Sequence, residues 1–496
     1  MDTSNTPPAT ATPPVEDDRV WKAGRLDPMP IRKLPDAPPS VHIVGPTVFL
    51  VALGVGIGES YMWPRLVLLF GPEIRWLFLI GVTLQAVVML EMARYAMATG
   101  ESIFSGAARV FKPLMWFFFI VAIAVYIWPG HLSAGAAAFE QITGIPWIIT
   151  AIAGLVLVGV VFSLAKVIYN LLENVLSLLI GALVLGTAVI AAMVGSWGDV
   201  ADTITGMFAI GYLPSEALSA AWFPVIVGAC AFAGPSGMQQ MWYTLHLRDS
   251  GAGMGAHIPK VRGLRHAGEE EEMPARGFMF DTDDPAEMAK WKGWRRWVTF
   301  DALLLFWGVT MLVTISFTVI AQSAARLNPG VQTALQQDDR EAALGAMSDA
   351  VSSAGSSVLG AVFLGFIALI GLNATLGLFD SFSRGQADMT YNFVPGAKKI
   401  GMSRLYGIFL WAVIIFGILI LLFGPADGPN EILDTLAFLS TFAMGAYCVT
   451  LLLVNNRMLP KPIRPRWWSN VIIGFGAVFY LGLLFYCLFA YGVAIG

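Results

Sequence analysis

The chain has 496 residues, of which 56% are hydrophobic and only 13% are charged, with a formal net charge of −4. Soluble domains usually carry about 25% charged residues, so this composition excludes an ordinary soluble protein. Apolar runs of about 20 residues, each long enough to cross a bilayer, recur along the whole chain. We therefore expect an all-α polytopic membrane protein whose surroundings are the lipid bilayer and not nucleic acid.

Eleven segments are predicted to span the membrane. They cover residues 44–70, 73–99, 114–134, 147–164, 170–195, 222–245, 294–322, 355–380, 403–424, 431–454 and 468–492. Because Lys and Arg concentrate in cytoplasmic loops, their distribution sets the orientation. Most of the 30 Lys and Arg fall on the inner side if the N-terminus is cytoplasmic. This predicts a multi-pass protein of the inner or plasma membrane with an extracytoplasmic C-terminus.

Polar segments flank and connect these spans. Residues 1–43 are rich in proline and polar residues and lack an apolar region, so they are predicted to be a disordered cytoplasmic tail without a signal peptide. Residues 246–293 form a predicted cytoplasmic loop, and residues 323–354 a predicted outward loop that could hold a short helix. Cysteine spacing fits no disulfide framework or zinc site, and no phosphate-binding loop is present. We expect neither an enzyme nor a cofactor.

The first predicted span is interrupted at its centre by Gly54-Val55-Gly56-Ile57-Gly58-Glu59-Ser60. A membrane-spanning helix tolerates unwound backbone only where protein or a water-filled cavity satisfies the freed backbone groups. A second interruption, Ala233-Gly234-Pro235-Ser236-Gly237, lies in the sixth span, where proline removes a backbone hydrogen bond. Each interruption alone could be a kink at a packing contact, since Gly and Pro are common in membrane helices.

The two interruptions occupy matching positions in two halves of five spans, residues 44–195 and 222–454. Paired broken helices at equivalent positions are typical of an inverted repeat that binds its substrate between the halves. We therefore predict a secondary transporter with a mid-membrane site, and a peripheral eleventh helix over residues 468–492.

The order of segments resembles the Nramp family of proton-coupled divalent metal transporters. The resemblance extends from Gly45 to about Pro460. It is carried by Gly45-Pro46, Glu91-Met92-Ala93-Arg94-Tyr95 with Thr99-Gly100, Gly144-Ile145-Pro146, Glu173, Gly228-Ala229 and Asp301. It implies a LeuT-type fold of 11 transmembrane helices, arranged as a 5+5 inverted repeat with discontinuous helices 1 and 6. It also implies symport of a metal ion with protons.

The metal-site motifs of that family are missing. Its DPGN motif aligns with Ile57-Gly58-Glu59-Ser60 and its MPH motif with Gly234-Pro235-Ser236, while its acidic pair in the third span aligns with Trp128 and His131. A thioether ligand favours transition metals, so its loss removes the evident basis for selecting manganese or iron. The remaining oxygen and amide groups suit a hard cation such as magnesium. They suit a small polar organic solute equally well.

Ionisable side chains within membrane spans are costly and are therefore functional candidates. The predicted metal ligands are Glu59, Ser60 and Ser236. The predicted substrate-binding residues are Gly56, Ile57, Gly58, Glu59, Ser60, Ala233, Gly234, Ser236, Gln239 and Asn373. Proton coupling is predicted for His131, Glu59 and Asp301. Structural alternatives are an ion pair of Glu59 with Arg65, an interhelical hydrogen bond of His131, and an interfacial pairing of Asp301 with Arg295 or Arg296.

Three functions remain open from the sequence: a hard-cation transporter, a transporter of a small polar organic solute, and a non-transporting sensor or scaffold that acts through the loop 246–293. The sequence does not set the oligomeric state, and a monomer is compatible with it.

Overall fold

The computed structural model describes residues 19–38, 56–164, 168–259, 276–337, 339–424 and 428–492, without the side chains of residues 168–180. Its two short strands, β1 (Val20–Trp21) and β2 (Met29–Pro30), pair antiparallel. The α-helices are α2 (Trp63–Phe70), α3 (Trp76–Thr99), α4 (Ile103–Val110), α5 (Lys112–Tyr126), α6 (Gly130–Thr143), α7 (Trp147–Leu164), α8 (Ile168–Val194), α9 (Trp197–Gly206), α10 (Phe223–Ala231), α11 (Gln239–Asp249), α12 (Pro285–Asp301), α13 (Thr310–Leu327), α14 (Gly330–Gln336), α15 (Ala342–Ala354), α16 (Ser357–Phe393), α17 (Met402–Phe423), α18 (Pro429–Met458) and α19 (Trp467–Tyr491).

Shorter helical segments join these elements. Two are π-helices, η1 (Gly58–Met62) and η6 (Ala302–Val309). The others are 3₁₀-helices, namely η2 (Pro72–Arg75), η3 (Ser215–Leu218), η4 (Gly253–His257), η7 (Ala397–Lys399) and η8 (Lys461–Ile463).

Eight helical stretches within the described residues are long and apolar enough to cross a membrane, or up to nine if a bent pair is counted as one span. The chain is thus a multi-pass membrane protein. Three of the eleven predicted spans are not among the eight: the fifth, which is the bent pair, and two others. The span 44–70 lies partly outside the described residues. The span 222–245 is divided into α10 and α11, and each of these is too short to cross alone.

The bent pair lies in the fifth predicted span. The chain turns by 117° between Gly181–Val194 and Trp197–Gly206, so α9 occupies part of the predicted connection 196–221. Ser196 fixes this turn: its hydroxyl accepts from the backbone N–H of Asp199, and the Asp199 carboxylate accepts from the backbone N–H of Ser196. The predicted loop 323–354 likewise holds two helices, α14 and α15. Small amphipathic helices of this kind are hard to distinguish from polar loops by composition.

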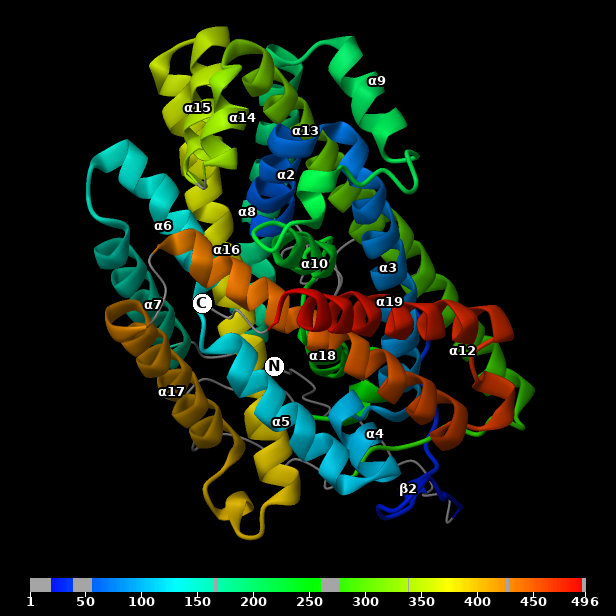
Figure 1. Ribbon diagram of the computed structural model, residues 1–496. Coiled ribbons are helices and arrows are strands. Elements are labelled where there is room, and N and C mark those ends of the chain that lie inside the picture. The colour runs from blue at the N-terminus through cyan, green and yellow to red at the C-terminus, as the bar shows by residue number, and fades with distance from the viewer. Residues whose placement is uncertain are drawn as a thin grey trace, which may run out of the picture.

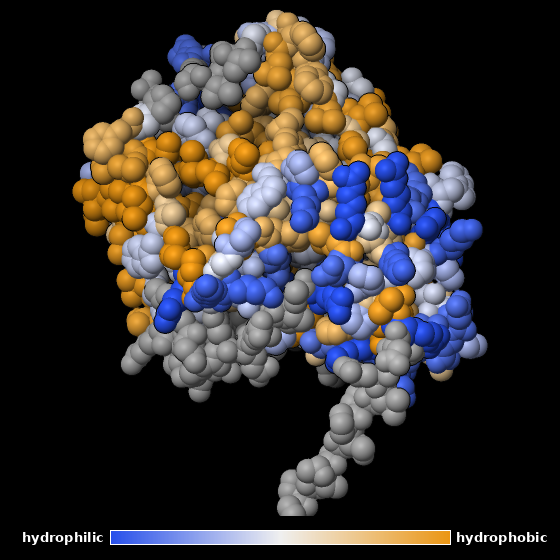
Figure 2. Space-filling view, turned by 90° about the horizontal axis from the view of Figure 1, so that it is seen from below, coloured by the Kyte–Doolittle hydropathy of each residue, from blue (hydrophilic) through white to orange (hydrophobic). Residues whose placement is uncertain are grey.

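Figure 1 shows α9, α14 and α15 at one end of the bundle and α4 and β2 at the other. We call these the α15 end and the α4 end. The α4 end, seen in Figure 2, carries a broad area of hydrophilic residues from the centre to the right of the view, and hydrophobic residues lie at the left and top. Between the ends, α16 packs along α6, and α18 packs against α10 and α19. Glycine allows the close approach of α6 and α16, since a Cβ on Gly135 would lie 3.1 Å from the Cα of Gly371.

Residues 19–38 of the predicted disordered tail are ordered in the structure. The side chains of Met29 and Leu34 are fully buried, and Ile31 forms a bridge with Met279. Arg109 of α4 donates hydrogen bonds of 3.0 Å to two carbonyl oxygens of this segment. The composition of the tail misses this order because its few apolar residues are buried by other parts of the chain.

Candidate functional site

The sixth span is broken where the sequence predicts it. The helix α10 ends at Ala231, α11 begins at Gln239, and the residues between them are not helical. Gly234 has a φ of +131° and Gly237 a φ of +55°, which side chains other than glycine rarely adopt. The glycines and Pro235 therefore account for the break.

The first span is described only from Gly56 onward, so Gly54 and Val55 of the predicted interruption lie outside the described residues. From Gly58 to Met62 the chain forms the π-helix η1, which continues directly into α2. Residues 58–60 are thus wound in a wide turn, where the sequence predicts unwound backbone. Single π-helical turns of this kind are frequent at functional sites.

The described part of the first span is in direct contact with the break in the sixth span. A Cβ on Gly58 would clash with the carbonyl oxygen of Phe232, at the end of α10. From the other side, α3 approaches through Gly81, where a Cβ would lie 2.8 Å from the Cβ of Ala233 and 2.9 Å from the carbonyl oxygen of Cys230. Glycine at both contacts lets the first span and α3 approach the end of α10 and the sixth-span break closely.

Glu59 lies at this contact and is 1% exposed. Its Oε2 accepts a hydrogen bond of 3.1 Å from the backbone N–H of Gly56, and its Oε1 has no hydrogen-bond partner among the described residues. The carboxyl group is close enough to the Gly234 backbone and to the Arg75 guanidinium to interact with both electrostatically. The alternative pairing of Glu59 with Arg65 is wrong, because Arg65 bonds to Asp434 at 2.6 Å.

The two predicted serine ligands sit on opposite sides of the contact. The Ser60 hydroxyl donates to the carbonyl oxygen of Gly56 at 2.8 Å. The Ser236 hydroxyl accepts from Nε2 of Gln239 at 3.1 Å, and the Ser236 carbonyl accepts from the Tyr126 hydroxyl at 3.1 Å. Both hydroxyl oxygens keep lone pairs that could contact a bound ligand.

Three buried side-chain oxygens near the breaks have no hydrogen-bond partner in the described parts of the chain: Oε1 of Glu59, of Gln85 and of Gln239. Gln85 comes from α3, and its Oε1 lies 2.9 Å from the position of a Cβ on Gly234. Buried polar atoms in native proteins are nearly always bonded, so three unpaired acceptors in one region mark a place for water or a ligand. Sequence reasoning missed Gln85, although a polar residue in the middle of an apolar span was the available signal.

His131, at the start of α6, lies beside the sixth-span break. Its ring is 5.1 Å from that of Phe232 and it is 4% exposed. Neither ring nitrogen has a hydrogen-bond partner among the described residues, so the alternative of an interhelical hydrogen bond is not what the structure shows. Asp301 ends α12 and Asn373 lies within α16, and both are buried. Their coupling and substrate-binding roles stay predictions.

Ionic contacts link the elements at the α15 end. Asp434 of α18 accepts from Arg65 of α2 at 2.6 Å and from Arg340, just before α15, at 2.8 Å. The Tyr61 hydroxyl, in η1, donates to the carbonyl oxygen of Arg340 at 2.8 Å. We call Arg65, Arg340 and Asp434 the α15-end triad. It joins the segment that carries Glu59 to two other parts of the bundle.

The α4 end has its own buried ion pairs. Arg248, near the end of α11, bonds to Asp388 of α16 at 2.6 Å. Arg384 of α16 pairs with Asp380 at 3.0 Å and also with Asp249 of α11. A further pair joins Glu91 and Arg94 of α3 at 2.5 Å. The contact of η1 with the sixth-span break therefore lies between ionic clusters at either end.

The described residues contain no group of three or more His, Cys, Asp and Glu side chains that could hold a metal ion. Glu59 is the carboxylate at the contact of η1 with the sixth-span break, and hydroxyl, amide and backbone oxygens surround it, with the Arg75 guanidinium also within electrostatic reach. Such a set resembles no soft transition-metal site. It can accept hydrogen bonds or coordinate a hard cation that keeps part of its water.

Comparisons with solved structures identify the fold. The chain is similar to a manganese transporter of Eremococcus coleocola, with a TM-score of 0.60 and 14% identity over 91% of this chain and 86% of the other. A variant of that transporter gives a TM-score of 0.63 at 13% identity, over 93% and 90%. Mhp1, a nucleobase-cation-symport-1 family transporter, gives 0.51 at 12% identity, over 90% and 91%.

Neither a scan against protein-family models nor a search of curated proteins finds a match. The structural similarity extends over nearly the whole chain, so the chain has the LeuT-type fold, as the sequence predicts.

Proposed function

We propose that the chain is a secondary transporter that binds a small hydrophilic solute at the contact of η1 with the break in the sixth span. The observation that supports this most directly is the set of three buried, unpaired oxygens on Glu59, Gln85 and Gln239. Binding at interrupted helices near the bilayer midplane is the common arrangement in transporters of this architecture. The structural neighbours are themselves named as transporters, one of manganese.

For the substrate we propose a hard divalent cation such as Mg²⁺. One carboxylate with several neutral oxygens suits a cation that stays partly hydrated, because Mg²⁺ is usually held by one or two carboxylates. Ser60 and Ser236 would contribute hydroxyl oxygens, and His131 and Asp301 would carry the coupled proton. A small polar organic solute is the second candidate. The amide oxygens of Gln85 and Gln239 favour it, since they can accept hydrogen bonds from N–H groups.

We further propose that the α4 end faces the cytoplasm, as the basic residues indicate. The α15-end triad would then separate the site from the outer solution, and the α4-end pairs would separate it from the cytoplasm. Alternating access requires that each barrier opens in turn.

Uptake into proteoliposomes tests the proposal. The expected result is Mg²⁺ uptake that Glu59→Gln reduces about tenfold or more, because a hydrogen bond to a charged group contributes about 1.5–3 kcal/mol. Glu216→Gln, at an exposed position of η3, is the matched control and should transport normally. No Mg²⁺ or Mn²⁺ uptake, combined with thermal stabilisation by one member of a metabolite panel, would favour the organic solute. If the protein shows neither cation uptake nor stabilisation by a metabolite, the sensor or scaffold is the hypothesis that remains.

A further inference from the structure

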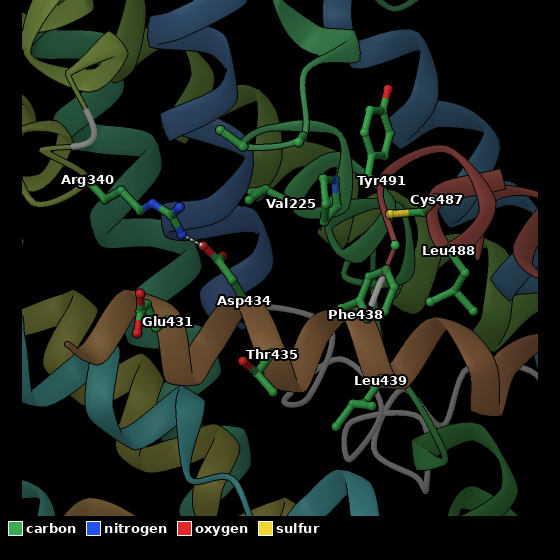
Figure 3. A pocket seen from close by; sticks show the side chains of 14 residues that line it. Val225, Arg340, Glu431, Asp434, Thr435, Phe438, Leu439, Cys487, Leu488 and Tyr491 are labelled. Atoms are coloured by element: carbon green, nitrogen blue, oxygen red, sulfur yellow. Dashed lines mark hydrogen bonds and ion pairs between the residues drawn. The ribbon is translucent and has the colours of Figure 1, made fainter. Parts of the chain in front are cut away.

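A cavity lies away from the contact of η1 with the sixth-span break, among α10, α18 and α19. It has a volume of about 240 Å³. Figure 3 shows Arg340, Glu431 and Asp434 at one end of it and Phe438, Cys487, Leu488 and Tyr491 toward the other. The cavity is therefore amphipathic along its length. Small-molecule sites in proteins combine apolar walls with a few placed polar groups in this way.

The polar end presents two opposite charges side by side. Both carboxylate oxygens of Asp434 are taken by arginines, one by Arg65 and the other by Arg340. These three residues together carry one net positive charge. Glu431 lies one helical turn before Asp434 on α18 and supplies a negative charge at the same end of the cavity. A zwitterion complements this arrangement, with its anionic group toward Arg340 and its ammonium toward Glu431.

The apolar end adjoins a surface that suits hydrocarbon. Cys487 and Leu488 of α19 line the cavity. On the same helix, Phe489 is 88% exposed and Phe485 is 48% exposed. These exposed aromatic side chains belong to a helix long and apolar enough to span the bilayer. A hydrocarbon chain that leaves the cavity along α19 would therefore stay in contact with apolar side chains.

We infer that this cavity binds a zwitterionic amphiphile, whose charged head contacts Arg340 and Glu431 and whose hydrocarbon lies against Leu488 and α19. The head could belong to a phospholipid that carries both phosphate and ammonium groups, or to a free zwitterion of the same chemistry. A ligand bound there would touch the α15-end triad through Arg340 and stabilise its closed arrangement. This site is separate from the proposed transport site at Glu59.

Native mass spectrometry of the purified full chain tests the inference with three probes: phosphatidylethanolamine, phosphatidylglycerol and free phosphoethanolamine. Phosphatidylethanolamine should bind about tenfold more tightly than phosphatidylglycerol, whose head lacks the ammonium. Leu488→Trp, which fills the cavity, should abolish this preference. Phe489→Trp is the matched control, one residue along the same helix but exposed, and should keep it.

Glu431→Gln provides a second test if Leu488→Trp does not fold, and should lower the preference for phosphatidylethanolamine about tenfold. Saturation by phosphoethanolamine alone would identify a free zwitterion as the source of the head group. Equal binding of the two phospholipids, or a preference unchanged in both Leu488→Trp and Glu431→Gln, would overturn the inference. Transport of Mg²⁺ can fail independently of this result, because Glu59 does not line the cavity.

Discussion

At the scale of single residues, the close packing around the sixth-span break depends on glycines. Gly58 and Gly81 have no Cβ, so backbone and small side chains of the sixth span can approach them closely. The polar groups that remain are buried, and some of their acceptors have no partner among the described residues. Buried acceptors without a partner lower the stability of the fold unless water or a ligand binds them. This effect on stability separates residues that bind the substrate from residues that stabilise the fold.

Replacing the two amide residues tests this separation. Gln85→Leu and Gln239→Leu each remove an unpaired buried acceptor, but each also removes one hydrogen bond donated by Nε2, to the Ala231 carbonyl oxygen and to the Ser236 hydroxyl respectively. The two effects are of similar size and opposite sign, so the melting temperature should change little. Uptake of the substrate should nevertheless fall, because the oxygen that contacts it is gone. Thermal unfolding in detergent and proteoliposome uptake, measured on the same preparations, give both values. A parallel loss of stability and uptake would indicate a structural role instead.

Gly58→Ala should destabilise the protein by about 1–3 kcal/mol, because the added methyl group clashes with the carbonyl oxygen of Phe232 and the core has no room to relax. Gly365→Ala, within α16, is the control: its Cβ would meet nothing within 4 Å, so it should be neutral or stabilising. Thermal unfolding compares the two. Equal melting temperatures would show that the two spans do not meet as closely as described.

At the scale of elements, charged side chains connect helices that lie far apart in the sequence. The α15-end triad joins α2, α18 and the segment before α15. Arg65 is fully buried and Asp434 is 9% exposed. Removal of one member would leave a buried charge without its partner, which is much more costly than the net contribution of the intact pair.

Asp434→Asn should therefore destabilise the closed α15 end by about 3–5 kcal/mol. Asp349→Asn, at an exposed position of α15, should change stability little. Accessibility of a cysteine introduced at Tyr61 to a membrane-impermeant thiol reagent measures the opening, and it should rise in Asp434→Asn alone. Unchanged accessibility would show that the triad does not close this end.

A second connection holds the N-terminal segment. Arg109 of α4 binds the buried Glu101 at 2.6 Å as well as the carbonyl oxygens of Ala23 and Asp27. Burial alone would raise the pKa of Glu101, but the hydrogen bonds and charge of Arg109 outweigh it and lower the pKa below the ordinary 4.5. The ionised carboxylate thus stabilises the fold above pH 4.5, and this stabilisation is lost as the pH falls through the lower folded-state pKa.

Glu101→Gln should accordingly be less stable than the parent chain at neutral pH, and the difference should shrink in acid. Melting temperatures between pH 3 and pH 7 measure it. Glu73→Gln, in η2 at the other end of the bundle, serves as the comparison. A difference that stays constant over this range would contradict the lowered pKa.

At the scale of the whole molecule, the LeuT-type fold was implied by the resemblance to the Nramp family. Long apolar runs and paired glycine-rich interruptions were by themselves enough to predict a multi-pass protein with interrupted helices, because they reflect the bilayer and the backbone directly. The break at 233–237 was predictable for the same reason. The partners of polar side chains were not. Arg65 finds Asp434, 369 residues further along, and Gln85 reaches the break from α3. Contacts of such separation depend on the packing of whole helices, which local patterns do not contain.

The ordered N-terminal segment limits how far the α4 end can open. Its carbonyl oxygen at Asp27 is held by α4, of the predicted first repeat, and its backbone N–H at Leu34 by Glu287 of α12, of the predicted second repeat. Seven residues of fully extended chain span about 25 Å at most. Residues 27–34 thus tether the two predicted halves to each other. At this end the two attachment points can separate by no more than the extended length of these residues unless one attachment is released.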